Sequence, residues 1–263
     1  MTTPLHLSRV RLKTLRGEAL ASIAPLLIPA NPKQQPAHAH RVLWLLFQDI
    51  PDSTRDFLWR DEGDGRFILL SARPPTDPHG LFHIDTKKFE TKLAVGDRLS
   101  FVMRANPTVA SKPALDRADH GKSADGKRAR GMRIDVVMRA LHAVPRTQWD
   151  ETTDRAISGR AVEREGIVTE ASREWLTTQA VKAGARLDAS SFSASSYTQT
   201  PVDRRSSQQR RAAGSKGRPG GFSSVDMAGM LTVQDPTLFV DKLARGFGSA
   251  KAFGCGLMLI RRA

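Results

Sequence analysis

The order of apolar patterns constrains the fold of this chain more than any other feature, because a similar order occurs twice. The first set reads strand, helix, strand, strand, helix, strand. Its members are a strand pattern at 5–12, a helical pattern through Val42, Leu43, Leu46 and Phe47, strands at 57–59 and 67–70, a short helix at 86–93 and a strand at 99–103. This order predicts a ferredoxin-like unit.

The second set follows a polar stretch at 112–133, which is rich in Lys, Arg, Asp, Gly and Ala. Its members are a strand at 134–138, a helix at 171–183, a strand-rich stretch at 222–233, a helix at 236–245 and a strand at 257–260. We therefore expect an α+β protein of two tandem ferredoxin-like domains. The expected division is an N-terminal domain over 1–111, a basic linker over 112–133 and a C-terminal domain over 134–263.

Charge indicates the class of partner. The formal net charge is +14 and the sequence pI is about 10.7, which favours a polyanion such as nucleic acid. The single cysteine, Cys255, excludes an internal disulfide and a cysteine-rich zinc site. No apolar run approaches the ~20 residues of a membrane span, so we expect a cytoplasmic protein with no membrane partner.

Two polar stretches interrupt the second set, the Ser-rich residues 189–200 and the basic residues 203–218. Both are too polar for a core, and we expect a mobile loop there. The basic stretch contains six positive residues and one acidic residue, Asp203. A flexible loop with this charge can follow the phosphates of an RNA duplex. The six positive residues are Arg204, Arg205, Arg210, Arg211, Lys216 and Arg218. The alternative is a disordered, solubilising loop.

A glycine-rich loop precedes the last strand. Gly246, Gly248, Gly254 and Gly256 surround Lys251. This density predicts a backbone that approaches another group closely, and the charge balance favours a phosphate. The loop follows a helix and lacks the GK[ST] ending of a P-loop, which disfavours a nucleotide-dependent enzyme. A tight helix-to-strand connection with no ligand is the other interpretation.

Four segments, in order along the chain, resemble the CRISPR-associated endoribonuclease family CasE, which cuts repeat RNA in type I-E systems. They are His40–Phe47, Arg55–Trp59, Phe101–Pro107 and Gly229–Leu257. The resemblance implies RRM-like domains of the RAMP superfamily that bind the CRISPR repeat hairpin and cleave at its 3′ base. It also implies 2′-hydroxyl attack without metal or cofactor, and a product that stays bound within the Cascade complex with its other subunits.

The resemblance also implies site residues. His40 falls where the family carries its catalytic histidine, and an imidazole with a pKa of about 6.5 exchanges protons near neutral pH. Ala37 stands where the family carries a tyrosine, so His38 is the candidate for the second role. Arg104 and Lys251 are further candidate RNA contacts. Because Ala37 departs from the pattern, a non-cleaving, structural RNA-binding subunit is the alternative function.

Overall fold

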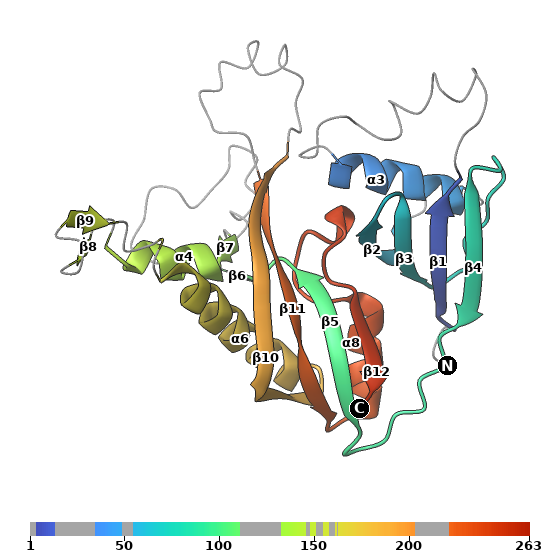
Figure 1. Cartoon of the computed structure of the whole chain (residues 1–263). Coiled ribbons are helices and arrows are strands. Elements are labelled where there is room, and N and C mark those ends of the chain that lie inside the picture. The colour runs from blue at the N-terminus through green and yellow to red at the C-terminus, as the bar shows by residue number, and fades with distance from the viewer. Residues whose placement is uncertain are drawn as a thin grey trace, which may run out of the picture.

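The computed structural model describes residues 4–13, 35–48, 55–110, 133–145, 148–150, 155–157, 161, 163–202 and 221–263. Two antiparallel sheets lie side by side, the first coloured blue to cyan and the second green to red (Figure 1). The six basic residues predicted between 204 and 218, and nearly all of the predicted linker 112–133, lie outside the described residues.

The first sheet has the strand order β2-β3-β1-β4, with every neighbouring pair antiparallel. Its elements are β1 (His6–Leu12), α3 (Gln35–Trp44), the 3-10 turn η2 (Leu45–Phe47), β2 (Phe57–Gly63), β3 (Arg66–Ser71) and β4 (Phe82–Lys88). Helix α3 buries Ala39, Val42 and Leu43 against one face of the sheet, as the helical spacing predicted.

The second sheet repeats this arrangement with the order β10-β11-β5-β12. Its main elements are β5 (Arg98–Ala105), α6 (Arg164–Lys182), β10 (Ala185–Pro201), β11 (Gly221–Val233), α8 (Pro236–Arg245), the 3-10 turn η3 (Lys251–Phe253) and β12 (Met258–Arg262). Between β5 and α6 lie β6 (Thr108–Ala110), β7 (Arg133–Asp135), α4 (Val136–Ala143), β8 (Gln148–Asp150) and β9 (Arg155–Ile157). Two tandem ferredoxin-like units are therefore present, as expected.

The strand at 99–103 was assigned to the wrong unit. It lies in β5, which pairs with β11 and β12 in the second sheet and buries Phe101 and Met103 in the second core. Apolar alternation identifies a strand but does not say which sheet it joins. The chain passes from the first sheet to the second between Lys88 and Arg98. We propose that the domain division lies there rather than at 112–133.

Two further elements differ from the prediction. Residues 86–88 belong to β4, and no helix forms at 86–93; the Thr86 and Ser8 hydroxyls are hydrogen-bonded at 2.9 Å across β4 and β1. The strand expected at 134–138 ends at Asp135, whose side chain accepts hydrogen bonds from the amides of Val137 and Met138 and so begins α4. The N-cap carboxylate favours a helix here, although the apolar run that follows it has the pattern of a strand.

The Ser-rich residues 189–200 are not a loop. They lie in β10, an edge strand that pairs antiparallel with β11 over its length, with register shifts after Asp188 and after Ser195. At a sheet edge the backbone is paired on one side only, and polar side chains remain solvated. Polarity therefore did not exclude a strand. Helix α6 also begins earlier than predicted, at Arg164.

The C-terminal stretch joins the two units through β2. Phe57 and Trp59 point into the first core, and Leu58, on the opposite face of β2, packs with Leu257 and Leu70. A Cβ on Gly254 would lie 3.1 Å from the Trp59 ring. The glycine-rich loop therefore packs directly against the first unit.

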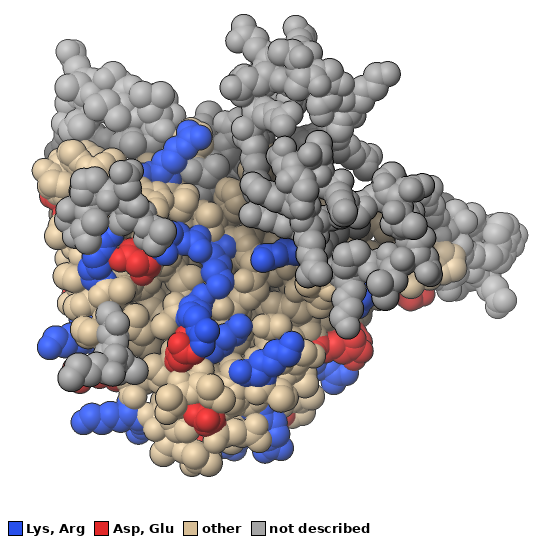
Figure 2. Space-filling view, turned by 180° about the vertical axis from the view of Figure 1, so that it is seen from behind, with Lys and Arg blue, Asp and Glu red and all other residues tan. Residues whose placement is uncertain are grey.

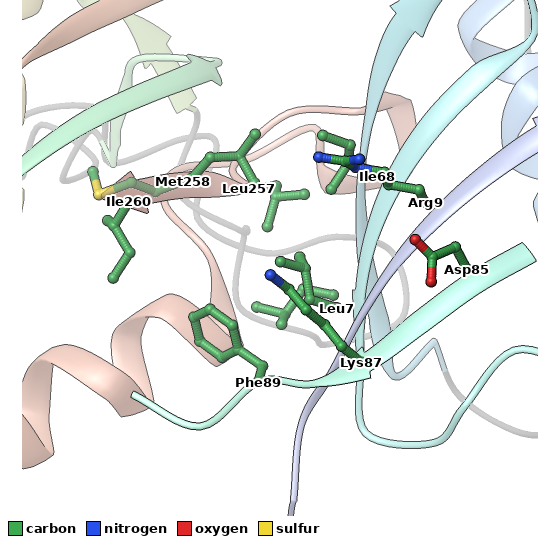
Figure 3. A pocket seen from close by; sticks show the side chains of 11 residues that line it. Leu7, Arg9, Ile68, Asp85, Lys87, Phe89, Leu257, Met258 and Ile260 are labelled. Atoms are coloured by element: carbon green, nitrogen blue, oxygen red, sulfur yellow. The ribbon is translucent and has the colours of Figure 1, made fainter. Parts of the chain in front are cut away.

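An apolar cleft of about 330 Å³ opens at the same junction, between β12 and the first sheet (Figure 3). Leu7, Ile68, Phe89, Leu257 and Ile260 are among the residues that line it, and Arg9, Asp85 and Lys87 supply its charged groups. No histidine is among the described residues that line it, so we place the candidate active site elsewhere.

Candidate active site

His40 lies in α3 with its ring held by two aromatic neighbours. Trp44 follows it by one helical turn, and the Trp44 Nε1–H donates a hydrogen bond of 3.1 Å to His40 Nε2. The Phe57 ring lies 6.2 Å from the imidazole, and Trp44 meets Phe57 edge-on at 5.4 Å. Residues of one helix and one strand therefore fix the position of this imidazole.

The hydrogen bond also decides the tautomer of His40. An indole N–H is a donor only, so Nε2 must be the unprotonated nitrogen and the neutral ring carries its proton on Nδ1. In this state Nδ1–H can donate to a phosphate oxygen. Nε2 can accept a proton once the bond from Trp44 is exchanged for one from a substrate hydroxyl.

The surroundings of His40 favour its neutral form. Burial lowers the pKa of His40 below its ordinary 6.5, and the positive charge of Arg55 lowers it further. A neutral imidazole at neutral pH has the protonation state that a general base requires.

The second unit brings the turn that carries Lys251 against α3, the helix of His40. Turn η3 packs against both α3 and β2. Burial lowers the pKa of Lys251, and among the nearby charges that lower it further is that of Arg55. Arg55 is itself half-buried, and burial lowers its pKa. Arg55 thus stands close to both His40 and Lys251, although the two residues belong to different units.

Among the described residues, no carboxylate pairs with Arg55 or Lys251. Nearby arginines are neutralised in contrast; for example, Arg73 Nε donates to Asp56 Oδ2 at 2.6 Å. Partly buried cations without a carboxylate are costly unless an anion binds them. Figure 2 shows several Lys and Arg side chains across the middle of the rear face, with acidic side chains next to some of them. The arrangement suits a phosphate beside a proton carrier.

A family model described as CRISPR associated protein matches residues 5–262, nearly the whole chain. The chain belongs to this family. The predicted resemblance to CasE is confirmed by the Cascade subunit CasE of Escherichia coli (strain K12), which is 28% identical over 225 residues, 83% of this chain and 88% of that protein.

Solved structures of other CRISPR associated proteins share the fold. Thermus thermophilus Cse3, bound to an RNA representing a pre-cleavage complex, superposes with a TM-score of 0.55 at 19% identity over 98% of this chain and 99% of that one. Cas6e from Escherichia coli K-12 gives a TM-score of 0.50 at 21% identity over 98% of this chain and 100% of that one. In the described part of this CRISPR associated protein, no helix is long and apolar enough to cross a membrane.

The other predicted site residues are less well placed. Arg104 donates two hydrogen bonds to Asp226, at 2.9 and 2.7 Å, so its charge is largely neutralised. His38 is partly exposed on α3, about 200° around the helix axis from His40. The single tyrosine, Tyr197, donates to Asp135 at 2.8 Å, and burial is the main cause that raises its pKa to about 12. The roles of Arg104 and His38 stay predictions.

Sequence reasoning missed two members of the site, Trp44 and Arg55. Trp44 packs against the first core, and its N–H also donates the hydrogen bond that holds His40. The spacing of four residues from His40 is the signal that identifies it. Arg55 opens one of the family-like segments, yet its distance from His40 along the chain gave no sign that the two are neighbours.

We expect replacement of Arg55 by glutamine to raise the pKa of His40 toward 6.5. The substitution removes a positive charge that disfavours the imidazolium, so protonation becomes easier. NMR titration of the His40 ring resonances measures this directly. Arg55→Lys keeps the charge and should leave the pKa low; an equal rise in both variants would show that the charge is not the cause.

We expect Trp44→Phe to change the tautomer of neutral His40. The variant retains an aromatic ring against Phe57 but has no N–H to donate, so the reason for Nε2 to stay unprotonated is lost. The ¹⁵N shifts of the ring should report Nδ1–H in the wild type and a shift toward Nε2–H in the variant. Unchanged shifts would contradict this account of the His40–Trp44 pair.

Proposed function

We propose that this chain is a CasE-type endoribonuclease that binds the repeat stem-loop of precursor CRISPR RNA, cleaves it at the 3′ base of the hairpin, and remains with the product as a Cascade subunit. The observation that carries the cleavage function is the neutral His40 near Arg55, which is in turn near Lys251, two cations that have no carboxylate partner among the described residues. The Escherichia coli relative is a Cascade subunit by name, and the Thermus thermophilus protein was solved with RNA, which supports both the substrate and the assembly.

The proposed reaction is an internal transesterification. The ribose 2′-oxygen bonds to the adjacent phosphorus, the bond from phosphorus to the 5′-oxygen breaks, and the products end in a 2′,3′-cyclic phosphate and a 5′-hydroxyl. One group must accept the 2′-hydroxyl proton and another must protonate the leaving oxygen. His40 exchanges one of these protons, at Nε2 if it is the base, and Arg55 and Lys251 stabilise the negative charge on the phosphate oxygens.

His38 stays the candidate for the second proton, although it lies about 200° around the axis of α3 from His40. It follows Ala37, the position at which the family's tyrosine is missing, and it lies on the same helix as His40. Tyr197 is not proposed for this role because its hydroxyl donates to Asp135, beside the start of α4.

The basic residues between 204 and 218 are proposed to hold the hairpin stem. A-form RNA has a deep, narrow major groove, so recognition there rests chiefly on phosphates and shape. Binding should therefore weaken steeply with added salt. Arg104 is a weaker candidate because Asp226 already occupies its guanidinium group. With such an RNA partner, we place the protein in the cytoplasm.

The proposal is tested by incubating the full chain with its cognate repeat hairpin in excess EDTA and analysing the product ends. A single cut that leaves a cyclic phosphate supports a metal-independent nuclease. Tight binding without a cut, under EDTA and with added divalent metal alike, would instead assign the chain to the alternative, a structural RNA-binding subunit. Cleavage only with metal would contradict the proposed chemistry.

A further inference from the structure

A hollow of about 840 Å³ lies on the second unit, beside η3 and separate from the His40 ring. It is bounded by the end of β5, by β7 and the start of α4, by the facing ends of β10 and β11, and by the glycine-rich loop. Its lining includes Asn106, Thr108, Arg133, Phe222, Ser249 and Phe253. A volume of this size suits a ligand larger than a bare phosphate.

Two aromatic rings form one wall. Phe222, at the start of β11, stacks on Phe253 of η3 with 4.8 Å between ring centroids and an interplanar angle of 13°. Both rings are partly exposed. A ring pair at the wall of a polar hollow offers a flat apolar surface on which a third planar group can continue the stack.

Polar groups form the floor. The hydroxyls of Thr108 and Ser249 are hydrogen-bonded to each other at 2.8 Å. Within the described part of the chain, Asn106 Oδ1 is buried without a hydrogen-bond partner, and Asn106 is only 6% exposed. Unpartnered polar atoms in a native protein are costly, and a ligand that reaches the floor would supply partners.

The charged residues that line this hollow are Arg133 and Asp135. The oxygens of the Asp135 carboxylate accept hydrogen bonds from the amides of Val137 and Met138 and from the Tyr197 hydroxyl, which leaves Arg133 as the charged group that can bind a ligand. Arg133 is exposed at the rim, and its charge is one of those that lower the pKa of Lys251. The hollow therefore combines a flat apolar wall, a polar floor and a cation, which are the features that a nucleotide requires.

Turn η3 connects the hollow to the candidate active site. Phe253 lines the hollow, whereas the same turn packs against α3, which carries His40. We propose that the hollow binds one unpaired nucleotide of the repeat RNA next to the cut, with its base stacked on the Phe222–Phe253 pair and a phosphate near Arg133. This inference rests on the proposed function, because it places the nucleotide relative to the cleaved bond.

The test is a mutant cycle between protein and RNA. Repeat hairpins are made with one abasic residue at each position on either side of the cut, and affinity and cleavage are measured with wild type and with Phe222→Ala. At one position, the loss of the base should weaken wild-type binding about tenfold. Phe222→Ala should weaken binding of the intact RNA similarly, and the two changes together should cost no more than either alone.

Phe89→Ala is the matched control, because Phe89 is a partly exposed aromatic residue that lines the other cleft. Any effect of Phe89→Ala on affinity should be the same for intact and abasic RNAs, so this variant should show no coupling to the base. Phe222→Tyr retains the stacking surface and should retain the coupling. Thermal unfolding shows whether each variant is folded, and the wild-type series with abasic RNAs does not depend on any variant.

Additive effects of Phe222→Ala and every abasic change, with normal binding and cleavage of the intact hairpin by wild type, would overturn this inference and leave the proposed function standing. Absence of base dependence at every position next to the cut would overturn it equally. If wild type neither binds nor cleaves the intact hairpin, the proposed function fails, and this inference fails with it.

Discussion

Replacing His40 by alanine is expected to slow cleavage of the repeat hairpin by about 10²- to 10⁴-fold, the usual contribution of a positioned acid or base. The imidazole is the candidate proton carrier near Arg55, and alanine removes a neutral side chain while the charged residues stay in place. Binding affinity should therefore stay within the error of measurement. Single-turnover cleavage and equilibrium binding, measured on the same RNA, separate the two effects.

His83→Ala is the control for this experiment. His83 is an exposed histidine on β4 of the same unit, outside the candidate active site. It should cleave at the wild-type rate. Equal cleavage by wild type and His40→Ala would show that the proton carrier is another residue, whereas equal losses of affinity and rate would assign His40 to RNA binding.

Substitution of Gly256 by alanine is expected to lower the free energy of unfolding by about 2–4 kcal/mol. Gly256 has φ +94°, and an added Cβ would lie 2.5 Å from the carbonyl oxygen of Phe247. That contact cannot relax cheaply. The Phe247 amide donates to the Gly256 carbonyl at 2.9 Å, and the Gly256 amide donates to the Arg104 carbonyl at 2.7 Å. These hydrogen bonds hold the backbone of Phe247 and of Gly256 in place.

Gly166→Ala provides the matched control, because Gly166 lies in α6 with no atom within 4 Å of an added Cβ. Alanine there should raise stability by up to about 1 kcal/mol through its better helix propensity. Urea unfolding of wild type and both variants measures the difference. A Gly256→Ala variant as stable as wild type would mean that the close approach of this loop is dispensable.

The glycine-rich loop illustrates how far the sequence could be interpreted. Its density of glycine correctly indicated a backbone in close contact with another group. The groups that the described residues place against Gly246 and Gly254 are Leu58 and Trp59 of the first unit, together with backbone of the loop itself. Composition could not distinguish these neighbours from a phosphate, because both demand the same lack of a side chain.

Patterns local in the sequence were interpreted correctly where one element determines them. The helices α3 and α8 and the strand predicted at 67–70 depend on side chains a few residues apart. The errors arose where partners distant in the sequence decide. Strand β5 joined the second sheet because β11 and β12 pair with it, and the polar β10 formed because β11 supplies its hydrogen bonds.

The sequence by itself determined the repeated strand and helix order, the basic character and, through its resemblance to CasE, the position of His40. Only the tertiary structure placed Arg55 near both that histidine and Lys251, gave Trp44 its hydrogen bond to the ring, and opened the hollow beside η3. The reason is physical. Periodicity records which face of an element is buried, whereas an active site depends on which buried faces meet, and here β2 and the glycine-rich loop meet from opposite ends of the chain.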